Sequence, residues 1–402
     1  MSRAVASCGA ICLLAAAAWA DARVETADGR VVAGQLVAVG PAGVVVKAPG
    51  GKEQTLPPAD VMEVLLAEPT DVLAAAGQAV LLTAADDRLA IRDLAYDGNG
   101  LRASTSLLGP IRMKLEAVRA IVLPGAAQTP RDVQEQVTAL SLPESTVDRL
   151  VVHRNDRKDR PLLSVDGVLQ GIDDDRVTFR WQDVSRKVPR ETVRLIHLAA
   201  VQDIQAARKG VLIGRDGSTV GFGELTLAKD TIELVGPAVG RCSVQLTKVA
   251  AIRYASDTMV PLSERKPDAV KEQGFFQTTF PHRKDRSASG KPLRLGGRTY
   301  RTGLGLHSYC ELLYQLDGKY AGFVATVGID DAVRPHGDAT VHFIGDGRPL
   351  SDPVRATGKT DPTPVRLKLE GVNTFLIRVD FGEDGLGFGD HVDLVGARLL
   401  RK

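Results

Sequence analysis

The chain has 402 residues, and 51 Lys plus Arg stand against 49 Asp plus Glu, so its formal net charge at pH 7 is only +2. This balance, without a basic run, argues against a nucleic-acid partner, because such proteins concentrate positive charge against phosphates. A hydrophobic content of 44% and a charged content of 25% are ordinary for a globular protein, and the length predicts two or three domains.

Residues 1–20 are predicted to be a secretory signal peptide. Arg3 supplies the positive start, Ala10 to Ala18 the short apolar core, and Ala18-Trp-Ala20 a small-x-small cleavage site. The apolar stretch is too short for a membrane span, so we expect a secreted or periplasmic protein with no membrane span after signal cleavage. An uncleaved anchor or a lipid attachment is the alternative.

Two of the four cysteines fall in this signal, which leaves Cys242 and Cys310 in different predicted domains. We expect two buried thiols that pack as small hydrophobic groups, although the sequence leaves one disulfide open.

Between the signal and residue 257 the sequence repeats itself weakly. Each unit has short β-rich runs around turn residues and closes with an apolar strand of the form Val-x-x-[Val/Ile]. Four or five short strands in about 50 residues suit a small SH3-like or Sm-like barrel, which would be marginal alone and should pack in pairs. We expect the first unit to pair with the second and the third with the fourth. The predicted units are residues 21–69, 70–125, 148–200 and 201–257, and their closing strands begin at Val61, Val118, Val193 and Val249.

Two linkers are predicted. Residues 126–147 separate the second and third units, and a weak helical pattern over 131–140 predicts a short helix there. Residues 258–272 contain Pro261, Pro267 and several charges, so they are predicted to link the repeats to the last domain.

Residues 273–402 show clean strand alternation. Val365, Leu367 and Leu369 alternate with charged residues, and Gly345-Asp-Gly347 is a hairpin signal. Alternating strands with polar turns and no helical period predict an antiparallel β-sandwich, so the whole chain is predicted to be all-β.

This last domain also carries an ordered set of motifs. They are Gly303-Leu-Gly-Leu-His-Ser-Tyr-Cys-Glu-Leu-Leu-Tyr314, Leu316-Asp-Gly-Lys-Tyr320, Val327-Gly-Ile-Asp-Asp331, Gly345-Asp-Gly347 and Asp390-His-Val-Asp393. In that order they resemble the NPCBM family of carbohydrate-binding modules, which are appended to bacterial glycoside hydrolases. The resemblance implies a galactose-binding-like β-sandwich (jelly roll) that recognises sugars without cleaving them.

The candidate carbohydrate-binding residues are His307, Tyr309, Phe388, Asp390 and His391. An imidazole can donate and accept hydrogen bonds with sugar hydroxyls, but His307 could equally be a buried histidine that pins a loop. Asp390 and His391 could bind a sugar, help to hold a calcium ion, or close a structural network.

Aromatic rings are the second requirement, because a pyranose presents an apolar face. Leu394 stands where the family often has Trp, and Trp181, in the third repeat unit, is the one tryptophan after the signal. Tyr309, Phe388 and Tyr300 are therefore the candidate stacking rings, and binding should be weak. No cofactor is expected apart from a structural calcium ion, and Asp330-Asp331 is interpreted as part of a solvated turn.

The sequence favours an exported, non-catalytic carbohydrate-binding protein whose partner is a glycan or a cell-envelope polysaccharide. No nucleophile elbow or Cys/His arrangement supports an enzyme. The first alternative is a structural or protein-interaction protein of the cell envelope whose sandwich does not bind sugar, and the second is an unrecognised glycoside hydrolase.

Overall fold

A computed structural model describes residues 21–68, 70, 73, 78–125, 128–129, 146–154, 162–199, 208–274 and 280–402. Regular structure in these residues is almost entirely antiparallel strand, interrupted by single 3-10 turns. The predicted all-β class is therefore confirmed. The predicted signal peptide and the predicted helix at 131–140 lie outside the described residues.

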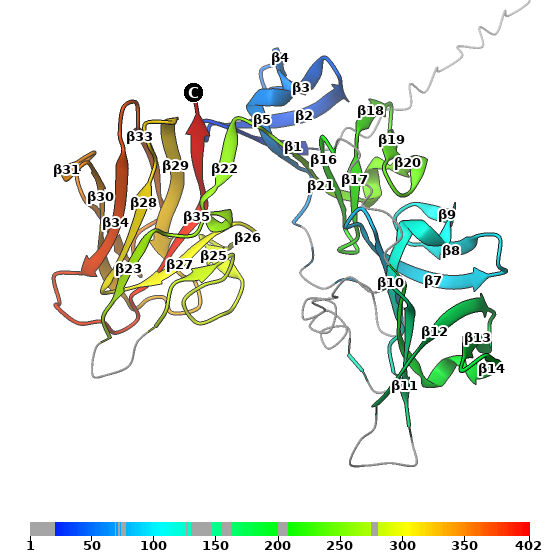
Figure 1. Ribbon diagram of the computed structural model, residues 1–402. Coiled ribbons are helices and arrows are strands. Elements are labelled where there is room, and N and C mark those ends of the chain that lie inside the picture. The colour runs from blue at the N-terminus through cyan, green and yellow to red at the C-terminus, as the bar shows by residue number, and fades with distance from the viewer. Residues whose placement is uncertain are drawn as a thin grey trace, which may run out of the picture.

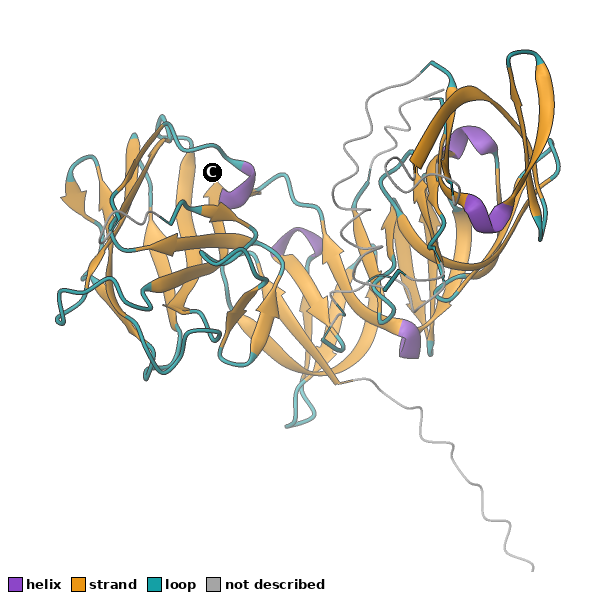
Figure 2. Cartoon of the chain, turned by 90° about the horizontal axis from the view of Figure 1, so that it is seen from below, coloured by secondary structure: helices purple, strands orange, loops and turns teal. Residues whose placement is uncertain are grey.

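Each repeat is a five-stranded antiparallel unit with a 3-10 turn directly before its last strand (Figures 1 and 2). Within a unit, the first four strands pair with one another in the order in which they follow along the chain, and the fifth strand pairs with the first. In the fourth unit the second strand is broken at Gly223 into β17 and β18. The similarity to SH3 or Sm barrels stays a prediction. The strands are β1 (Asp21–Thr26), β2 (Val31–Gly40), β3 (Gly43–Lys47), β4 (Glu53–Leu56) and β5 (Val61–Leu65); β6 (Ala79–Thr83), β7 (Arg88–Tyr96), β8 (Leu101–Thr105), β9 (Gly109–Met113) and β10 (Val118–Val122); β11 (Asp148–His153), β12 (Leu162–Ile172), β13 (Arg176–Trp181), β14 (Val184–Pro189) and β15 (Val193–His197); β16 (Gly210–Gly214), β17 (Thr219–Phe222), β18 (Glu224–Ala228), β19 (Thr231–Gly236), β20 (Gly240–Gln245) and β21 (Val249–Tyr254).

The units pack in pairs, but the expected partners were wrong. The closing strand β5 of the first unit pairs with β21 of the fourth, and β10 of the second pairs with β15 of the third. The order is therefore nested, with the second and third units between the halves of the outer pair. One hydrophobic cluster runs through all four units, so the two pairs share a core. The second and third units, which are neighbours in sequence, are thus strand partners, whereas the first unit pairs with the fourth and not with the second.

The C-terminal part is a sandwich of two antiparallel sheets. The first sheet has the order β24-β27-β35-β29-β33, and the second has the order β23-β28-β34-β30-β31. Phe323, Phe343 and Phe375 pack between them, and the predicted inward set Val365, Leu367 and Leu369 is buried. This confirms the predicted sandwich. Its strands are β22 (Met259–Pro261), β23 (Ala269–Glu272), β24 (Arg283–Lys284), β25 (Leu293–Leu295), β26 (Arg298–Tyr300), β27 (Gly303–His307), β28 (Cys310–Gln315), β29 (Tyr320–Ile329), β30 (Asp338–Gly345), β31 (Arg348–Pro349), β32 (Val354–Thr357), β33 (Thr363–Lys368), β34 (Thr374–Phe381) and β35 (His391–Arg401).

The sandwich begins earlier than predicted. Strand β22 pairs with β35, strand β23 pairs with β28, and Leu262 between them is fully buried in the sandwich core. Residues 258–272 are thus not a free linker. The prolines misled the prediction because they lie at an edge strand and beside it, where a missing N–H costs little.

Two arginines of the sandwich hold the first unit against its first sheet. Arg398 donates to the carbonyl oxygens of Thr26 and Ala27 at 3.0 and 2.9 Å, and its guanidinium lies 3.1 Å from Glu25. Arg366 donates to the carbonyls of Asp28 and Gly29 at 2.8 and 2.7 Å. The β1–β2 turn therefore docks near the end of β35, while the start of β35 lies at the opposite end of the sandwich (Figure 1).

The two cysteines among the described residues are free thiols. Cys310 is buried, and its burial raises the pKa of the thiol to about 12, whereas Cys242 is half-buried in the fourth unit. Within the described residues, no helix is long and apolar enough to cross a membrane.

Candidate functional site

Three loops of the sandwich converge at the end away from the repeats, and Asp390 ties them together. The fully buried Asp390 carboxylate accepts a hydrogen bond from Ser308 Oγ at 2.5 Å and another from the Asp338 backbone N–H at 2.9 Å. Burial is the main cause that raises the pKa of Asp390 to about 6. Through these two hydrogen bonds, Asp390 joins the turn after β27 and the start of β30 to the start of β35. We call this region the loop end.

His307 and His391 lie directly opposite each other where β27 pairs with β35. Their ring centroids are 5.4 Å apart, and Phe280 stacks on His307 at 4.5 Å and lies 5.5 Å from His391. Nδ1 of His307 lies 2.6 Å from the Ser308 carbonyl oxygen, and burial lowers the pKa of the ring. No local sequence signal predicted a role for Phe280. In this arrangement His307 is a buried ring that pins the turn.

Asp393 shares the outer face of the first sheet with His391. It is buried beneath the β25–β26 hairpin, where the Arg294 backbone N–H donates to its Oδ2 at 3.2 Å. Burial, then the charge and hydrogen bond of neighbouring Asp330, raises the pKa of Asp393 to about 10. These surroundings favour the neutral, protonated form of the Asp393 carboxyl group. Among the described side chains, no group of three or more His, Cys, Asp or Glu is placed to hold a metal ion.

Tyr309 does not join the other predicted site residues. The chain crosses from the first sheet to the second between His307 and Cys310, so the Tyr309 ring turns to the outer face of the second sheet. There Lys271 Nζ lies 5.0 Å from the ring centroid, and the hydroxyl donates to Glu311. The prediction placed Tyr309 beside His307 because the two are close in sequence, but the crossing separates their side chains.

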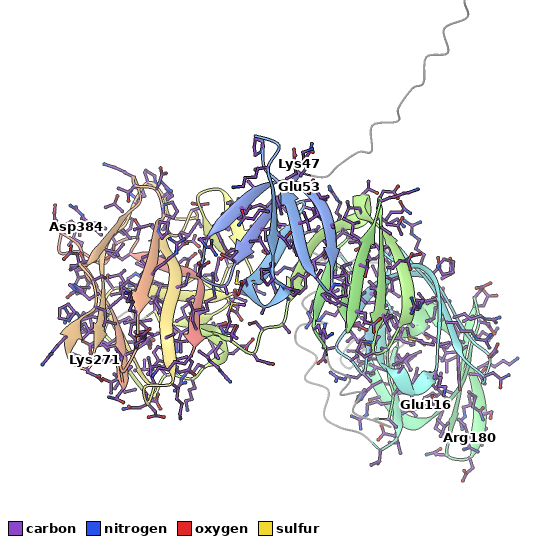
Figure 3. The ribbon with its side chains drawn as sticks, turned by 90° about the horizontal axis from the view of Figure 1, so that it is seen from above. Lys47, Glu53, Glu116, Arg180, Lys271 and Asp384 are labelled. Atoms are coloured by element: carbon purple, nitrogen blue, oxygen red, sulfur yellow. The ribbon has the colours of Figure 1, made fainter. Side chains whose placement is uncertain are left out.

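Phe388 is the most exposed large hydrophobic residue in the described part of the chain, with 72% of its surface accessible. His336 lies against it edge to face at a centroid distance of 5.5 Å. The two loops meet back to back at Gly337 and Gly389, where a Cβ on Gly337 would lie 2.3 Å from the Gly389 carbonyl oxygen. We call Phe388 and His336 the aromatic tip. Asp384, in the same loop as Phe388, lies on the side of the sandwich away from the repeats (Figure 3).

His336 was not among the predicted sugar-binding residues, because the polar loop that starts at Asp330-Asp331 was interpreted as a solvated turn in preference to a calcium site. The signal that could have found it is the glycine that follows it, since Gly337 has a φ of +93° and allows the two loops to touch.

Trp181 is not an open platform in the third unit. Its ring packs against Phe179, and the Arg186 guanidinium lies 4.3 Å above the ring centroid. The tryptophan therefore serves the core of its unit and a cation–π contact.

Residues 259–400 match the family model described as the NPCBM/NEW2 domain. A 91-residue stretch is 35% identical to the "Putative endo-alpha-N-acetylgalactosaminidase" of Renibacterium salmoninarum, and this stretch is 22% of this chain but only 6% of that protein.

Among solved structures, a similar one is the CBM51 module of a Clostridium perfringens GH95 protein in complex with methyl-galactose. It has 27% identity and a TM-score of 0.32, and the match covers 35% of this chain and 99% of that one. Another is the C. perfringens ZmpB structure of CBM51-2 in complex with GlcNAc and INT domains, at 19% identity and a TM-score of 0.33, covering 48% of this chain and 38% of that one. The family-model match confirms the resemblance seen in the sequence motifs: residues 259–400 of this chain are an NPCBM/NEW2 domain, of a family of carbohydrate-binding modules.

Proposed function

We propose that the protein is an exported, non-catalytic carbohydrate-binding protein whose sandwich binds sugar at the loop end. The observation that carries this proposal is the aromatic tip. A phenylalanine that leaves most of its surface in water, held in place by a second ring, stands out in a domain whose other described aromatic side chains are buried or half-buried.

The Phe388 ring supplies an apolar face for a pyranose, and the His336 imidazole beside it can donate and accept hydrogen bonds with hydroxyls. Asp390 and His307 act one step further in, because they fix the loops that carry these rings. His391 completes the buried ring cluster beneath them.

Two further observations favour binding without cleavage and an open site. Asp390 and Asp393, the two acids of the Asp390-His-Val-Asp393 motif, are both fully buried, so neither is placed to reach a glycosidic bond. The repeats dock at the other end of the sandwich, so they leave the loop end accessible. Export rests on the predicted signal peptide alone.

The test is glycan binding by the full chain. Because the tip offers a phenylalanine where a tryptophan would give more contact area, single-site affinity should be weak, and immobilised multivalent glycans are the appropriate probe. Phe388→Ala should reduce binding at least about tenfold, which corresponds to one lost stacking contact of about 1.4 kcal/mol.

Val270→Ala is the matched control, since Val270 is an exposed apolar residue of strand β23 and lies outside the tip. Unchanged binding by Phe388→Ala, with both variants folded by circular dichroism, would remove the loop end as the site. Failure of the wild type to bind a broad glycan panel would instead favour the partner-binding alternative, for which exposed Leu162 and Val184 of the third unit offer a surface.

A further inference from the structure

A pocket of about 390 Å³ lies where the first unit, the fourth unit and the sandwich meet. Its floor is the outer face of the sheet that β1, β5, β21 and β16 form across the two units. The opposite wall comes from β26 and from Met259 of the sandwich. Its volume lies within the range of ligand sites, which often form between domains. We call it the junction pocket.

A row of charges crosses the floor from one part of the molecule to the next. Glu25 and Glu63 stand directly opposite each other on β1 and β5, and Glu63 in turn pairs with Arg253 of the fourth unit at 2.8 Å. Arg398 of the sandwich closes the row at 3.1 Å from Glu25. Two carboxylates side by side repel each other, so this row is not the arrangement that best stabilises a sheet.

The second and third units form the equivalent sheet without these carboxylates and arginines. Strand pairing places Leu82, Ala120 and His197 at the positions equivalent to Glu25, Glu63 and Arg253. The neighbouring row, Val80, Val122 and Leu195, is buried with Ala120 and Leu73 in an apolar cluster, and half-buried Leu82 packs against it.

The equivalent face is therefore closed by hydrophobic packing. Ion pairs of this kind are often no more stabilising than apolar residues of similar size. The Arg398–Glu25 contact helps to dock the first unit, but the equivalent face of the other pair is closed without any of the remaining charges of the junction pocket.

The wall opposite the floor adds an aromatic ring. The Arg298 guanidinium lies 5.9 Å from the Tyr300 ring centroid and 3.8 Å from Glu68 of the first unit. Tyr300 is half-buried and lines the pocket together with apolar Val211 on the floor. Tyr300, a candidate stacking ring in the sequence, is thus placed here and not at the loop end.

The mixture of positive and negative side chains that line the pocket limits the kind of ligand it can bind. Among the described residues that line the pocket, five are arginines and four are glutamates. An anion would meet the carboxylates, and a cation would meet the guanidiniums. A hydroxyl group donates to carboxylates and accepts from guanidiniums at once, so a polyhydroxylated ligand with an apolar face satisfies both sets and the ring. We infer that the junction pocket is a second saccharide site, which takes an uncharged mono- or disaccharide between the repeats and the sandwich.

The full chain should be tested by saturation-transfer NMR with methyl β-galactoside, N-acetylglucosamine, lactose and N,N′-diacetylchitobiose as probes. Val211→Phe fills the pocket without removing a polar group, and Tyr300→Ala removes the ring. Val184→Phe adds the same bulk to an exposed valine of the third unit and serves as the control. Thermal melts show whether each variant is folded.

We expect at least one probe whose signal falls fivefold or more in Val211→Phe and in Tyr300→Ala, and is unchanged in Val184→Phe and in Phe388→Ala. Binding that disappears in Phe388→Ala but survives in Val211→Phe would overturn this inference and leave the loop end as the sugar site. A probe that is lost in Val211→Phe and kept in Phe388→Ala supports the junction pocket and leaves the loop end to the assay with multivalent glycans, so the two proposals fail separately. A chain that binds none of the four probes at millimolar concentration overturns the junction site.

Discussion

Replacing Arg398 by Met should destabilise the docking of the first unit more than any other single change at this interface. Arg398 is only 3% exposed, and its guanidinium makes hydrogen bonds to the carbonyls of Thr26, Ala27 and Gly396 as well as the contact with Glu25. Methionine keeps much of the packing volume but none of these donors.

The magnitude follows from what the substitution leaves behind. Each buried carbonyl that loses its donor costs about 1–3 kcal/mol. The Glu25 carboxylate loses its cation, but that penalty is limited to about 3 kcal/mol at pH 7 because Glu25 can take up a proton instead, and burial already raises its pKa. Breaking a partly buried pair by removing one member typically costs about 3–5 kcal/mol, and we expect a loss in that range.

The assay is urea unfolding followed by far-UV circular dichroism and analysed transition by transition, because a chain of several units need not unfold in one step. Arg366→Met is the matched control. Arg366 also donates to two carbonyls of the same turn but is exposed, so its loss should cost no more than about 1 kcal/mol.

Adding Glu25→Gln to Arg398→Met should restore part of the loss, since a neutral amide is easier to bury than an unpaired carboxylate. Equal effects of Arg398→Met and Arg366→Met, or strict additivity with Glu25→Gln, would refute the reasoning.

Three further predictions concern the sandwich. Tyr314→Phe should be neutral or stabilise by up to about 1 kcal/mol in thermal melts, because the buried Tyr314 hydroxyl has no hydrogen-bond partner among the described residues; a clear loss of stability would show that the hydroxyl is satisfied. Burial and Asp330 raise the pKa of Asp393 to about 10, so the folded state keeps a proton that the unfolded chain releases above about pH 4. Its contribution to stability is then lost as pH rises towards 10, and Asp393→Asn should flatten the fall in melting temperature between pH 5 and pH 9; an unchanged slope would contradict this. A fragment of residues 259–402 should fold by circular dichroism, whereas 273–402 should not, because it lacks Leu262 and strands β22 and β23; a folded shorter fragment would show that these elements are dispensable.

Local features of this fold could be read from the sequence because strand alternation and turn chemistry are local. The turn at Gly40–Gly43 and the hairpin at Gly345-Asp-Gly347 lie where the glycines predicted them. The closing strand of each unit was visible as a short apolar run, since its inner face packs in the core that the units share.

Long-range pairing could not be read in this way. Nothing in the closing strand at Val61 distinguishes a partner one unit away from a partner three units away, because both present apolar residues with the same period. The choice depends on how all four units pack together, which no local window contains.

In the candidate site too, the features that depend on local sequence could be predicted and those that depend on long-range contacts could not. His307 and His391 could be grouped because both motifs end or begin strands of one sheet, and the structure places them opposite each other. Tyr309 could not be placed, because its direction depends on where the chain crosses between sheets. Phe280 and His336 contribute through contacts with residues far away in sequence.

The nested order of the units also has a consequence for how the chain is made. The hydrogen bond between Glu63 and Arg253 joins residues 190 positions apart. During synthesis the first unit therefore emerges long before its strand partner, with the edge of β5 unpaired, while the second and third units can complete their own pairing in between. Contacts of such high sequence separation form late and slowly, and an exposed strand edge can meanwhile join another chain. Export before folding would postpone this hazard until the whole chain has crossed the membrane, and a chaperone that covers the first unit would have most effect during that interval.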